Sequence, residues 1–311
     1  MKLQEVPRVR LRMNPVQARR QMPLHFMMIP AVAVTLIFSY GPLIGLVMAF
    51  QRFVPAQGFL HSQFVGLDNF NKLFTMTGGL QLLWNTFYIS IMKTVANQVV
   101  PIILAILLHE LTSRGFRRTV QTILYIPYFL SWVILGAVLR YFLSPDGFVN
   151  LILLKPLGIE PVLFLGSKDL FPYTLVVTDL WQNAGFGTII FLAAITNANP
   201  ELYEAATMDG ANRLHLVRHV TFPAMKPIII LSVTLSLGSV FNAGFDQIYM
   251  LQTSAVLETG DVIDTFVYRM GLQNQQYSLG AAVGLFKSIV SLVLVSLSYY
   301  LAYKYSDYRI F

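Results

Sequence analysis

The segment NPELYEAATMDGANRLHLVRHVTFPAMKP, residues 199–227, lies between two apolar runs and carries side chains of both charge signs. Asn199 can cap free backbone amides, Pro200 suits the first position of a helix, and Glu201 favours the positive end of the helix dipole. Gly210 is a natural stop for this helix, because glycine readily adopts the left-handed conformation that ends helices. The pattern therefore predicts a short helix followed by a sharp turn.

A second short helix is expected over residues 211–220, and Pro223 and Pro227 are expected to close the segment. The two helices together are predicted to form a helix–turn–helix, which we expect on one side of a membrane. His215 and His219 lie four residues apart in the second helix, a spacing that can hold a metal ion. Because this helix is charged and cytosolic in the prediction, we favour a solvated face and predict no metal site.

The composition is that of a membrane protein. With 55% apolar residues, 12% charged residues and a mean hydropathy of +0.60, the 311-residue chain differs from soluble proteins, in which about a quarter of residues are charged. The net charge of +7 does not indicate nucleic-acid binding, because the basic residues form no single patch with interleaved aromatics. The chain has no cysteine, which excludes disulfides, thiolate metal sites and cysteine nucleophiles.

Apolar runs long enough to cross about 30 Å of hydrocarbon predict an all-α integral membrane protein with six transmembrane helices. The predicted spans are 24–50, 84–108, 121–143, 171–195, 227–246 and 279–303. They form one membrane domain over 24–303, preceded by a basic segment, 1–23, and followed by a tail, 304–311. Fourteen lysines and arginines then lie in cytoplasmic segments and five in external loops, so both termini are predicted to be cytoplasmic.

Ionisable side chains inside the spans are costly, and the candidates here are Lys93, Asp179, Asp246 and Lys287. They can pair with each other or reach the interface, contact a polar cargo, or relay ions. An ion-coupled transporter is expected to carry acids on several facing helices and broken helices in matching halves, which this sequence does not show. An ion-coupled secondary transporter or a channel component is the alternative function that these groups leave open.

Spans four and five carry polar and aromatic residues at helical spacing. Asn183 and Phe186 lie three apart on one helix face, and Phe241 and Phe245 lie four apart on another. Sugars stack their apolar faces on aromatic rings and bond their hydroxyl groups to amides and carboxylates. The spacing is compatible with a sugar pathway and also with ordinary packing inside a helix bundle.

The segment 199–226 resembles the EAA loop of permease subunits in ATP-binding-cassette (ABC) importers. The loop pattern is Glu-Ala-Ala, three residues, Gly, nine residues and then Ile-x-Leu-Pro, and this chain has Val and Phe in place of Ile and Leu. In that family the loop contains the coupling helix, which docks into a cleft of the cytoplasmic ATPase. The resemblance implies that the ATPase-coupling residues are Glu204, Ala205, Ala206, Asp209, Gly210 and Pro223.

The resemblance extends from about residue 23 to residue 303 and is strongest to the polysaccharide-type permeases, the LplB-like group. It rests on the sequences FSYGPLIGLVMAFQ, FVGLDNF, FDQIYML, DVIDTFVYRMGL and AVGLFKS. Known members of this group import alginate or rhamnogalacturonan fragments. The resemblance implies a type I ABC importer permease fold and an oligosaccharide or polysaccharide cargo, with acidic, uronate-containing sugars among the candidates. For such a cargo, Arg140 or Arg269 could supply positive charge.

Aligned from the EAA loop, spans four and five also resemble those of the maltodextrin-type permease of the same superfamily. The resemblance places sugar-contacting positions at Asp179, Gln182, Asn183, Phe186, Gly238, Phe241, Asn242 and Phe245. Residue types agree at Phe241 and Asn242, and loosely at Phe186. This chain could instead be the partner whose pocket contributes little.

The sequence has no Walker-type glycine loop, so the chain is predicted to be a transport subunit with no ATPase site and no cofactor of its own. The resemblance implies several partners: a second homologous permease, two ABC ATPases that bind ATP and Mg, and an extracytoplasmic solute-binding protein. It also implies a multi-pass location in the bacterial cytoplasmic (inner) membrane. A membrane-embedded enzyme has no support, because the five histidines are dispersed.

Overall fold

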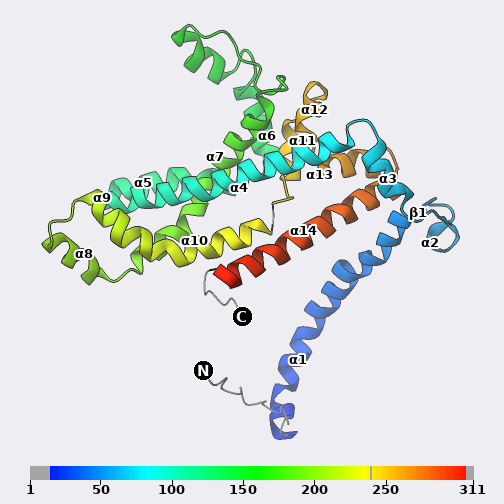
Figure 1. Ribbon diagram of the computed structural model, residues 1–311, viewed down its shortest axis with the longest axis horizontal. Coiled ribbons are helices and arrows are strands. Elements are labelled where there is room, and N and C mark those ends of the chain that lie inside the picture. The colour runs from blue at the N-terminus through cyan, green and yellow to red at the C-terminus, as the bar shows by residue number, and fades with distance from the viewer. Residues whose placement is uncertain (1–14, 239, 306–311) are drawn as a thin grey trace.

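The computed structural model describes residues 15–238 and 240–305, and all of its long elements are helices (Figure 1). Within these residues, five helices are long and apolar enough to cross a membrane: Met22–Phe50, Gly79–Glu110, Phe171–Thr196, Arg213–Leu237 and Tyr277–Tyr300. A sixth candidate is a bent pair, Arg114–Phe129 and Trp132–Phe142. The all-α class is confirmed. Of the predicted terminal segments, residues 1–14 and 306–311 lie outside the described residues.

The first apolar run forms α1 (Pro15–Thr35), the π-helical turn η1 (Leu36–Tyr40) and the 3-10 helix η2 (Gly41–Phe50). Its α1 part extends away from the other helices (Figure 1), and none of the most apolar stretch of the run is buried. Phe26 and Met27 are 75% and 76% exposed. Such a helix needs lipid or another protein around it, because no other described segment covers this stretch.

A small polar substructure follows the first span. It consists of β1 (Gln51–Arg52), α2 (Gly58–His61), β2 (Gln63–Phe64), which pairs antiparallel with β1, and α3 (Asp68–Thr75). The buried Asn69 fixes α3 to the end of η2, because its amide donates to Ala49 O at 3.0 Å and to Gln51 O at 2.9 Å. This substructure leads directly into the second span.

α4 (Gly79–Glu110) and α7 (Phe171–Thr196) lie side by side at the centre, and α14 (Tyr277–Tyr305) packs against η2 and the later helices (Figure 1). One hydrophobic cluster includes Ile89 of α4 and Phe171 and Leu175 of α7. A second cluster, towards the other end of both helices, includes Ala105 and Phe191. α4 and α7 each contribute to both clusters, so the two helices together form the centre against which the other elements are positioned.

The third apolar run, predicted as one span over 121–143, is broken. It forms α5 (Arg114–Tyr125), the 3-10 turn η3 (Ile126–Phe129) and α6 (Trp132–Phe142), with a bend of 106°. The causes are local in part. Pro127 has no backbone N–H to continue the helix, and the Ser131 hydroxyl caps the start of α6 by accepting from Ile134 N at 3.4 Å.

The rest of the cause lies in α7. Gly185 allows α5 to approach closely, because a Cβ at this position would lie 1.9 Å from Leu124 O. The buried Gln182 donates to Leu130 O at 2.9 Å, which satisfies a carbonyl that the broken helix leaves unpaired. The bend is therefore held by two residues about 50 to 60 positions away in the sequence.

The fifth run differs from its prediction at both ends. α9 (Arg213–Leu216), the π-helical turn η6 (Val217–Thr221) and α10 (Phe222–Leu237) form one span, so the prediction that Pro223 and Pro227 close the segment is wrong. Local π-helical turns let membrane helices accommodate proline, and η6 ends at Thr221, two residues before Pro223. The span ends at Leu237, before the predicted limit at Asp246, and α11 (Phe245–Leu251) begins beyond a break.

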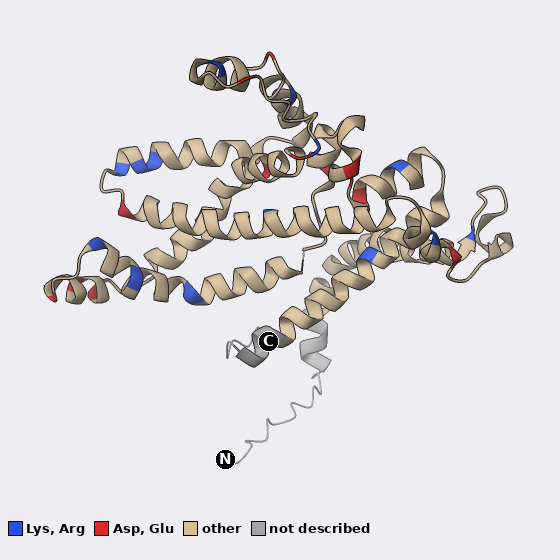
Figure 2. Ribbon diagram, turned by 45° about the horizontal axis from the view of Figure 1, so that its top comes forward, with Lys and Arg blue, Asp and Glu red and all other residues tan. Residues whose placement is uncertain are grey.

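Short elements complete the molecule. They are η4 (Val149–Leu154), η5 (Lys155–Leu157), η7 (Ser254–Val256), α12 (Leu257–Gly260), α13 (Ile263–Phe266) and η8 (Val267–Gln273). Figure 2 shows the charged residues mostly at the ends of the long helices and in the short elements, while the middle parts of the long helices are largely uncharged. This distribution is the one that a membrane requires.

Candidate functional site

α8 (Pro200–Met208) lies at one end of the molecule, in the connection between α7 and α9 (Figure 1). Its start has the predicted cap, because Asn199 Oδ1 accepts a hydrogen bond from Glu201 N at 3.0 Å. Gly210 has φ = +79°, the left-handed region that favours glycine. The predicted helix start and glycine stop are therefore confirmed, and α8, the turn and α9 together are called the hairpin below.

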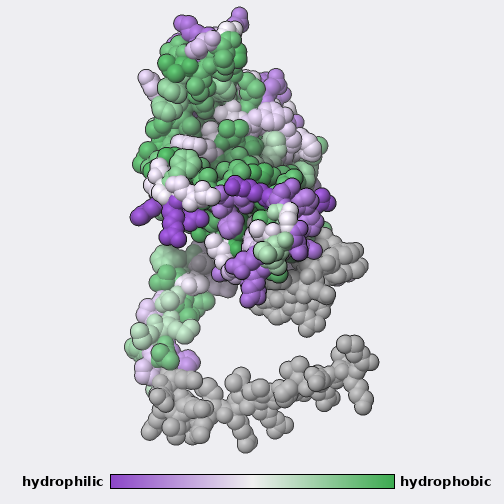
Figure 3. Space-filling model, turned by 90° about the vertical axis from the view of Figure 1, so that its left-hand side faces the viewer, coloured by the Kyte–Doolittle hydropathy of each residue, from purple (hydrophilic) through white to green (hydrophobic). Residues whose placement is uncertain are grey.

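The residues of the EAA pattern lie on the surface of the hairpin and of the helix that follows. The exposed members are Glu204, Ala205, Asp209, Gly210 and Pro223, while Ala206 is half-buried. Three large apolar side chains are also exposed: Leu202 by 54%, Met208 by 87% and Leu214 by 76%. Figure 3 views the molecule from this end and shows hydrophilic and hydrophobic patches side by side. Such a mixed surface suits a helix that docks into a groove of another protein.

Few described contacts fasten the hairpin to the bundle. Tyr203 Oη lies 3.1 Å from Thr221 Oγ1, and the Tyr203 ring lies 6.0 Å from the His109 ring. Arg213 and Glu110 lie 3.9 Å apart, but this pair, in which the Arg213 side chain is 76% exposed, contributes little to stability. The sequence prediction did not include Tyr203 or His109, and no local pattern links residues that are so far apart in the chain.

His215 and His219 lie with their rings almost parallel and 5.9 Å apart. His215 Nδ1 lies 2.9 Å from Asn212 Oδ1, and His219 Nδ1 lies 3.1 Å from the His215 carbonyl oxygen. Both histidines line a cavity of about 340 Å³ that also contacts Asp209 and Gly210. Among the described residues, no group of three or more histidine, cysteine or acidic side chains is placed to hold a metal ion.

Lys93 of α4 lies beside the break between α10 and α11. Its Nζ donates to Ala243 O at 2.6 Å and to Gln247 Oε1, and it lies 3.5 Å from Asp179 Oδ1. Asp179 also accepts from Asn97 at 2.7 Å. The side chains of Lys93 and Asp179 are 7% and 14% exposed. This buried pair therefore joins α4, α7 and the start of α11.

The other two ionisable candidates in the predicted spans differ from each other. Lys287 lies 2.6 Å from Asp264, and both side chains are about one-fifth exposed. Asp246 is exposed at the start of α11. Lys93 and Lys287 are thus each paired with an acid, the first of the three alternatives that the sequence left open.

The polar pathway candidates on α7 have partners inside the protein. Asp179 contacts Lys93, Gln182 donates to Leu130 O, and Asn183 donates to Asp179 O at 3.0 Å. Their amide nitrogens and carboxylate are therefore committed to internal contacts. A direct role of these three residues in sugar binding stays a prediction.

Replacing Gln182 with leucine is expected to destabilise the protein by about 1–3 kcal/mol, because Leu130 O then loses a buried donor. Thermal unfolding of the purified protein in detergent measures the effect. Asn183→Leu is the matched control, since Asn183 is the adjacent amide and contacts a carbonyl within its own helix. Equal stability of the two variants would contradict the capping role of Gln182.

The aromatic candidates Phe186 and Phe241 lie in different places. Phe186 is 40% exposed and stacks on Tyr128 of η3, with ring centroids 3.9 Å apart and an interplanar angle of 3°. Phe241 is half-buried, packs beside Phe87 at 6.2 Å, and precedes the exposed Asn242. Phe186 therefore lies at the bend of the third run, and Phe241 lies in the break after α10.

Phe245 is part of an aromatic cluster at the start of α11. Its ring is stacked with that of Tyr249 at 5.3 Å, and Tyr268 of η8 lies 5.3 Å from Phe245 and 5.0 Å from Tyr249. The sequence prediction included Phe245 alone. The i, i+4 spacing of Phe245 and Tyr249 was a readable signal for the pair, but no local pattern indicated Tyr268.

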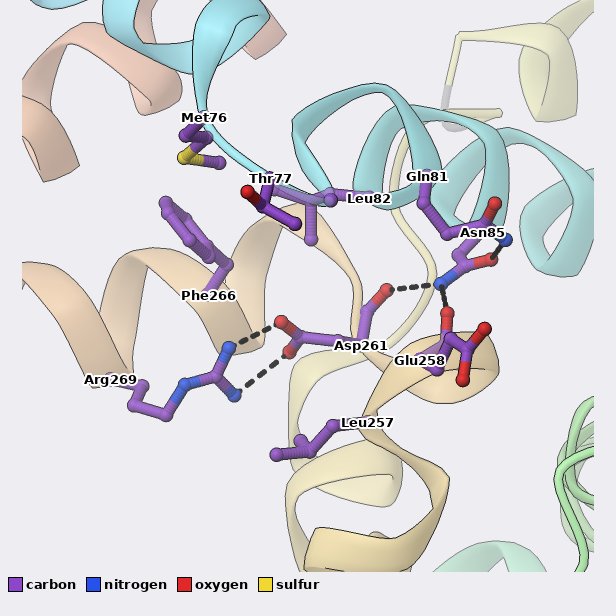
Figure 4. A pocket seen from close by; sticks show the side chains of 11 residues that line it. Met76, Thr77, Gln81, Leu82, Asn85, Leu257, Glu258, Asp261, Phe266 and Arg269 are labelled. Carbon is purple, nitrogen blue, oxygen red and sulfur yellow. Dashed lines mark hydrogen bonds and ion pairs between the residues drawn. The ribbon is translucent and has the colours of Figure 1, made fainter.

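A cavity of about 460 Å³ lies at the end of α4 that is opposite the hairpin, between α4, α12 and α13 (Figure 4). Arg269 forms a two-pronged ion pair with Asp261 there (Figure 4). The Asn85 amide donates to Glu258 O at 2.9 Å and to Asp261 O at 3.2 Å. On the rim, a hydrogen bond from Lys168 lowers the pKa of Glu258 below its usual range. The ion pair with Asp261 thus neutralises the positive charge of Arg269 within the chain.

A second cavity, of about 600 Å³, shares Arg269 and Leu257 with the first. It also contacts Arg140 and Tyr249. The two arginines that the sequence suggested as alternatives for an anionic cargo therefore border the same cavity.

A bundle of long apolar helices, with an exposed capped hairpin between two of its spans, defines a multi-pass membrane protein of the importer-permease class. The chain belongs to the family described as binding-protein-dependent transport system inner membrane component, which matches residues 97–311. It is therefore a permease subunit of an ABC importer, and it is located in the inner membrane. The resemblance stated from the EAA pattern is confirmed.

Relatives and solved structures agree with this family. The chain is 39% identical to the polygalacturonan/rhamnogalacturonan transport system permease protein YteP of Bacillus subtilis, over 94% of this chain and 91% of that protein. It matches a crystal structure of a bacterial ABC transporter that imports the acidic polysaccharide alginate, with a TM-score of 0.85, 35% identity, and coverage of 93% and 98% of the two chains. A structure of the alginate transporter in complex with an alginate pentasaccharide-bound periplasmic protein matches with a TM-score of 0.84 and 35% identity, over 92% of this chain and 96% of that chain.

Proposed function

We propose that this chain forms one half of the membrane pore of an ATP-driven importer that takes up oligosaccharides, with uronate-containing sugars as the favoured cargo. The other half is a second homologous permease. Two ABC ATPases that bind ATP and Mg contact the hairpin side, and an extracytoplasmic solute-binding protein contacts the opposite side. The observation that carries the proposal is the exposed hairpin with the EAA pattern, supported by the similarity to permeases of acidic polysaccharides.

The hairpin is proposed to be the coupling element. Glu204, Ala205 and Asp209 are exposed for contact with an ATPase cleft, and the small side chains of Ala205 and Ala206 permit close approach. Gly210 sets the direction in which the chain leaves α8, because the left-handed backbone conformation of this residue turns the chain sharply. The few contacts of the hairpin with the bundle fit a segment that is completed by a partner.

One membrane-spanning helix connects the hairpin to the pathway candidates that follow it. α9, η6 and α10 form one span from Arg213 to Leu237, so movement of the hairpin can be passed along a single helix. That helix ends at the break that carries Phe241 and Asn242, and Lys93 holds the far side of the break at Ala243. ATP-driven closure of the ATPases is thereby proposed to shift the pathway residues between inward-facing and outward-facing states.

Sugar contacts are proposed at the residues with free surface. Phe186 and Asn242 are exposed, and Phe245 belongs to an aromatic cluster of the kind on which sugar rings stack. Asp179, Gln182, Asn183 and Phe241 are proposed to shape the pathway by holding the helices around it. The chain itself needs no cofactor in this scheme.

The test is transport by the reconstituted complex of both permeases, the ATPases and the binding protein. Uptake of an oligogalacturonate into proteoliposomes is expected to require ATP and the binding protein, and to be independent of proton and sodium gradients. Uptake that follows an ion gradient without ATP would support the alternative of an ion-coupled transporter instead. Co-purification of the four kinds of subunit tests the proposed partners separately.

A further inference from the structure

The second cavity has the chemistry of an anion site. Its twelve lining residues include Arg140 and Arg269 and no aspartate or glutamate. Arg269 is already paired with Asp261, so it adds little net positive charge. Arg140 is in no ion pair among the described residues, and its side chain is exposed. The unpaired cation of the cavity is therefore Arg140.

Arg140 is held in a fixed orientation. Its Nε donates to Met250 O at 2.5 Å and its Nη2 donates to Gln252 O at 3.2 Å. A guanidinium has five N–H donors, so N–H groups on both terminal nitrogens stay free after these two bonds. Two such groups side by side are the arrangement that binds a carboxylate with two parallel hydrogen bonds.

The remaining lining suits a sugar rather than a simple anion. Tyr249 lines the cavity and stacks on Phe245, which is one of the proposed pathway residues. Gln252 also lines it, and Gln252 Oε1 is buried with no hydrogen-bond partner, an acceptor that a sugar hydroxyl could satisfy. A volume of about 600 Å³ lies within the range of small-molecule sites.

We propose that this cavity is a subsite for a uronate residue of the oligosaccharide cargo, in which Arg140 binds the carboxylate, Tyr249 contacts the sugar ring and Gln252 accepts from a hydroxyl group. The subsite rests on the proposed function, since it needs a carbohydrate cargo. It makes Arg140 a specificity-determining residue that favours acidic over neutral saccharides.

The experiment compares an oligogalacturonate with its fully methyl-esterified form in proteoliposomes that contain the whole importer. Arg140→Gln is expected to lower kcat/KM for the acidic form by about tenfold or more and to change that for the ester less than about twofold, because the ester has no charge to bind. Arg140→Lys is expected to fall between Arg140→Gln and the wild type, because it keeps the charge but loses the two-pronged geometry.

Two further variants complete the design. Gln252→Glu places a negative charge beside the cargo carboxylate, so it should also reduce uptake of the acidic form selectively. The backbone carbonyl of residue 252, which accepts from Arg140, is kept in this variant. Arg52→Gln removes an exposed positive charge from β1, outside the cavity, and should leave the ratio of the two uptake rates unchanged.

Equal loss for both saccharides in Arg140→Gln and Gln252→Glu would overturn the subsite, and would instead indicate that these residues serve folding or docking of the binding protein. If Arg140→Gln takes up both saccharides at the wild-type rates, so that their ratio is unchanged, the subsite is overturned as well. Failure of the wild-type importer to take up either saccharide is a different result, since it would contradict the proposed function itself.

Discussion

Replacement of Gly210 by valine is expected to abolish transport while the protein remains in the membrane. Gly210 has φ = +79°, a conformation that costs a β-branched residue about 1–3 kcal/mol, so the turn would rearrange and α8 would leave at a different angle. In the proposed function, a hairpin that no longer fits the ATPase cleft cannot pass on the movement. Uptake and ATPase activity of the assembled importer, both divided by the amount of permease in the membrane, measure the effect.

Gly158 supplies the matched control. It has φ = +73° and nothing within 4 Å of an added Cβ, so Gly158→Val imposes similar backbone strain outside the hairpin. Its transport should stay close to that of the wild type. Glu204→Lys is a second test of coupling without backbone strain, because it only reverses the charge of an exposed side chain. Full transport by both hairpin variants would refute the coupling role.

Lys93→Met is expected to destabilise the protein by about 3–5 kcal/mol, because it leaves the Asp179 carboxylate, which is 14% exposed, without its cation inside the bundle. The same change removes the donor of Ala243 O and Gln247 Oε1, which positions the start of α11. The loss should appear as a lower melting temperature of the purified protein in detergent and as less protein in the membrane.

A double variant, Lys93→Met with Asp179→Asn, should recover part of the lost stability, since no uncompensated charge then stays buried. Lys287→Met is the comparison, because its pair with Asp264 is more exposed and should cost less. A melting temperature of Lys93→Met equal to that of the wild type would show that this buried pair does not hold the break between α10 and α11.

Much of the fold was predictable because its signals are local. The apolar runs, the basic flanks and the Asn199 cap are properties of neighbouring residues, and they indicated the helices and the hairpin before any tertiary contact was known. The continuity of the fifth span was not predicted. Proline usually ends a helix, but here Pro223 lies in the first turn of α10 after a π-helical turn, and Pro227 is accommodated inside α10.

The candidate site was predictable to a smaller degree. The EAA pattern identified the hairpin from sequence, but the partners of Asp179 are not indicated by any local pattern. Asn97 lies 82 positions from Asp179, and Gln247 lies 154 positions from Lys93. Arg140 and Arg269 were separate suggestions until the fold placed them on one cavity.

The sequence by itself determined the helical class, most of the membrane-spanning runs and the capped hairpin, since hydropathy, capping and glycine conformation act within a few residues. Only the tertiary structure decided which distant residues hold the bend of the third run, which groups satisfy Lys93, and which arginine keeps a free guanidinium edge. The physical reason is that a buried polar group takes whichever partner the packing brings within about 3 Å. That partner depends on how distant helices pack, and no short stretch of the chain specifies it.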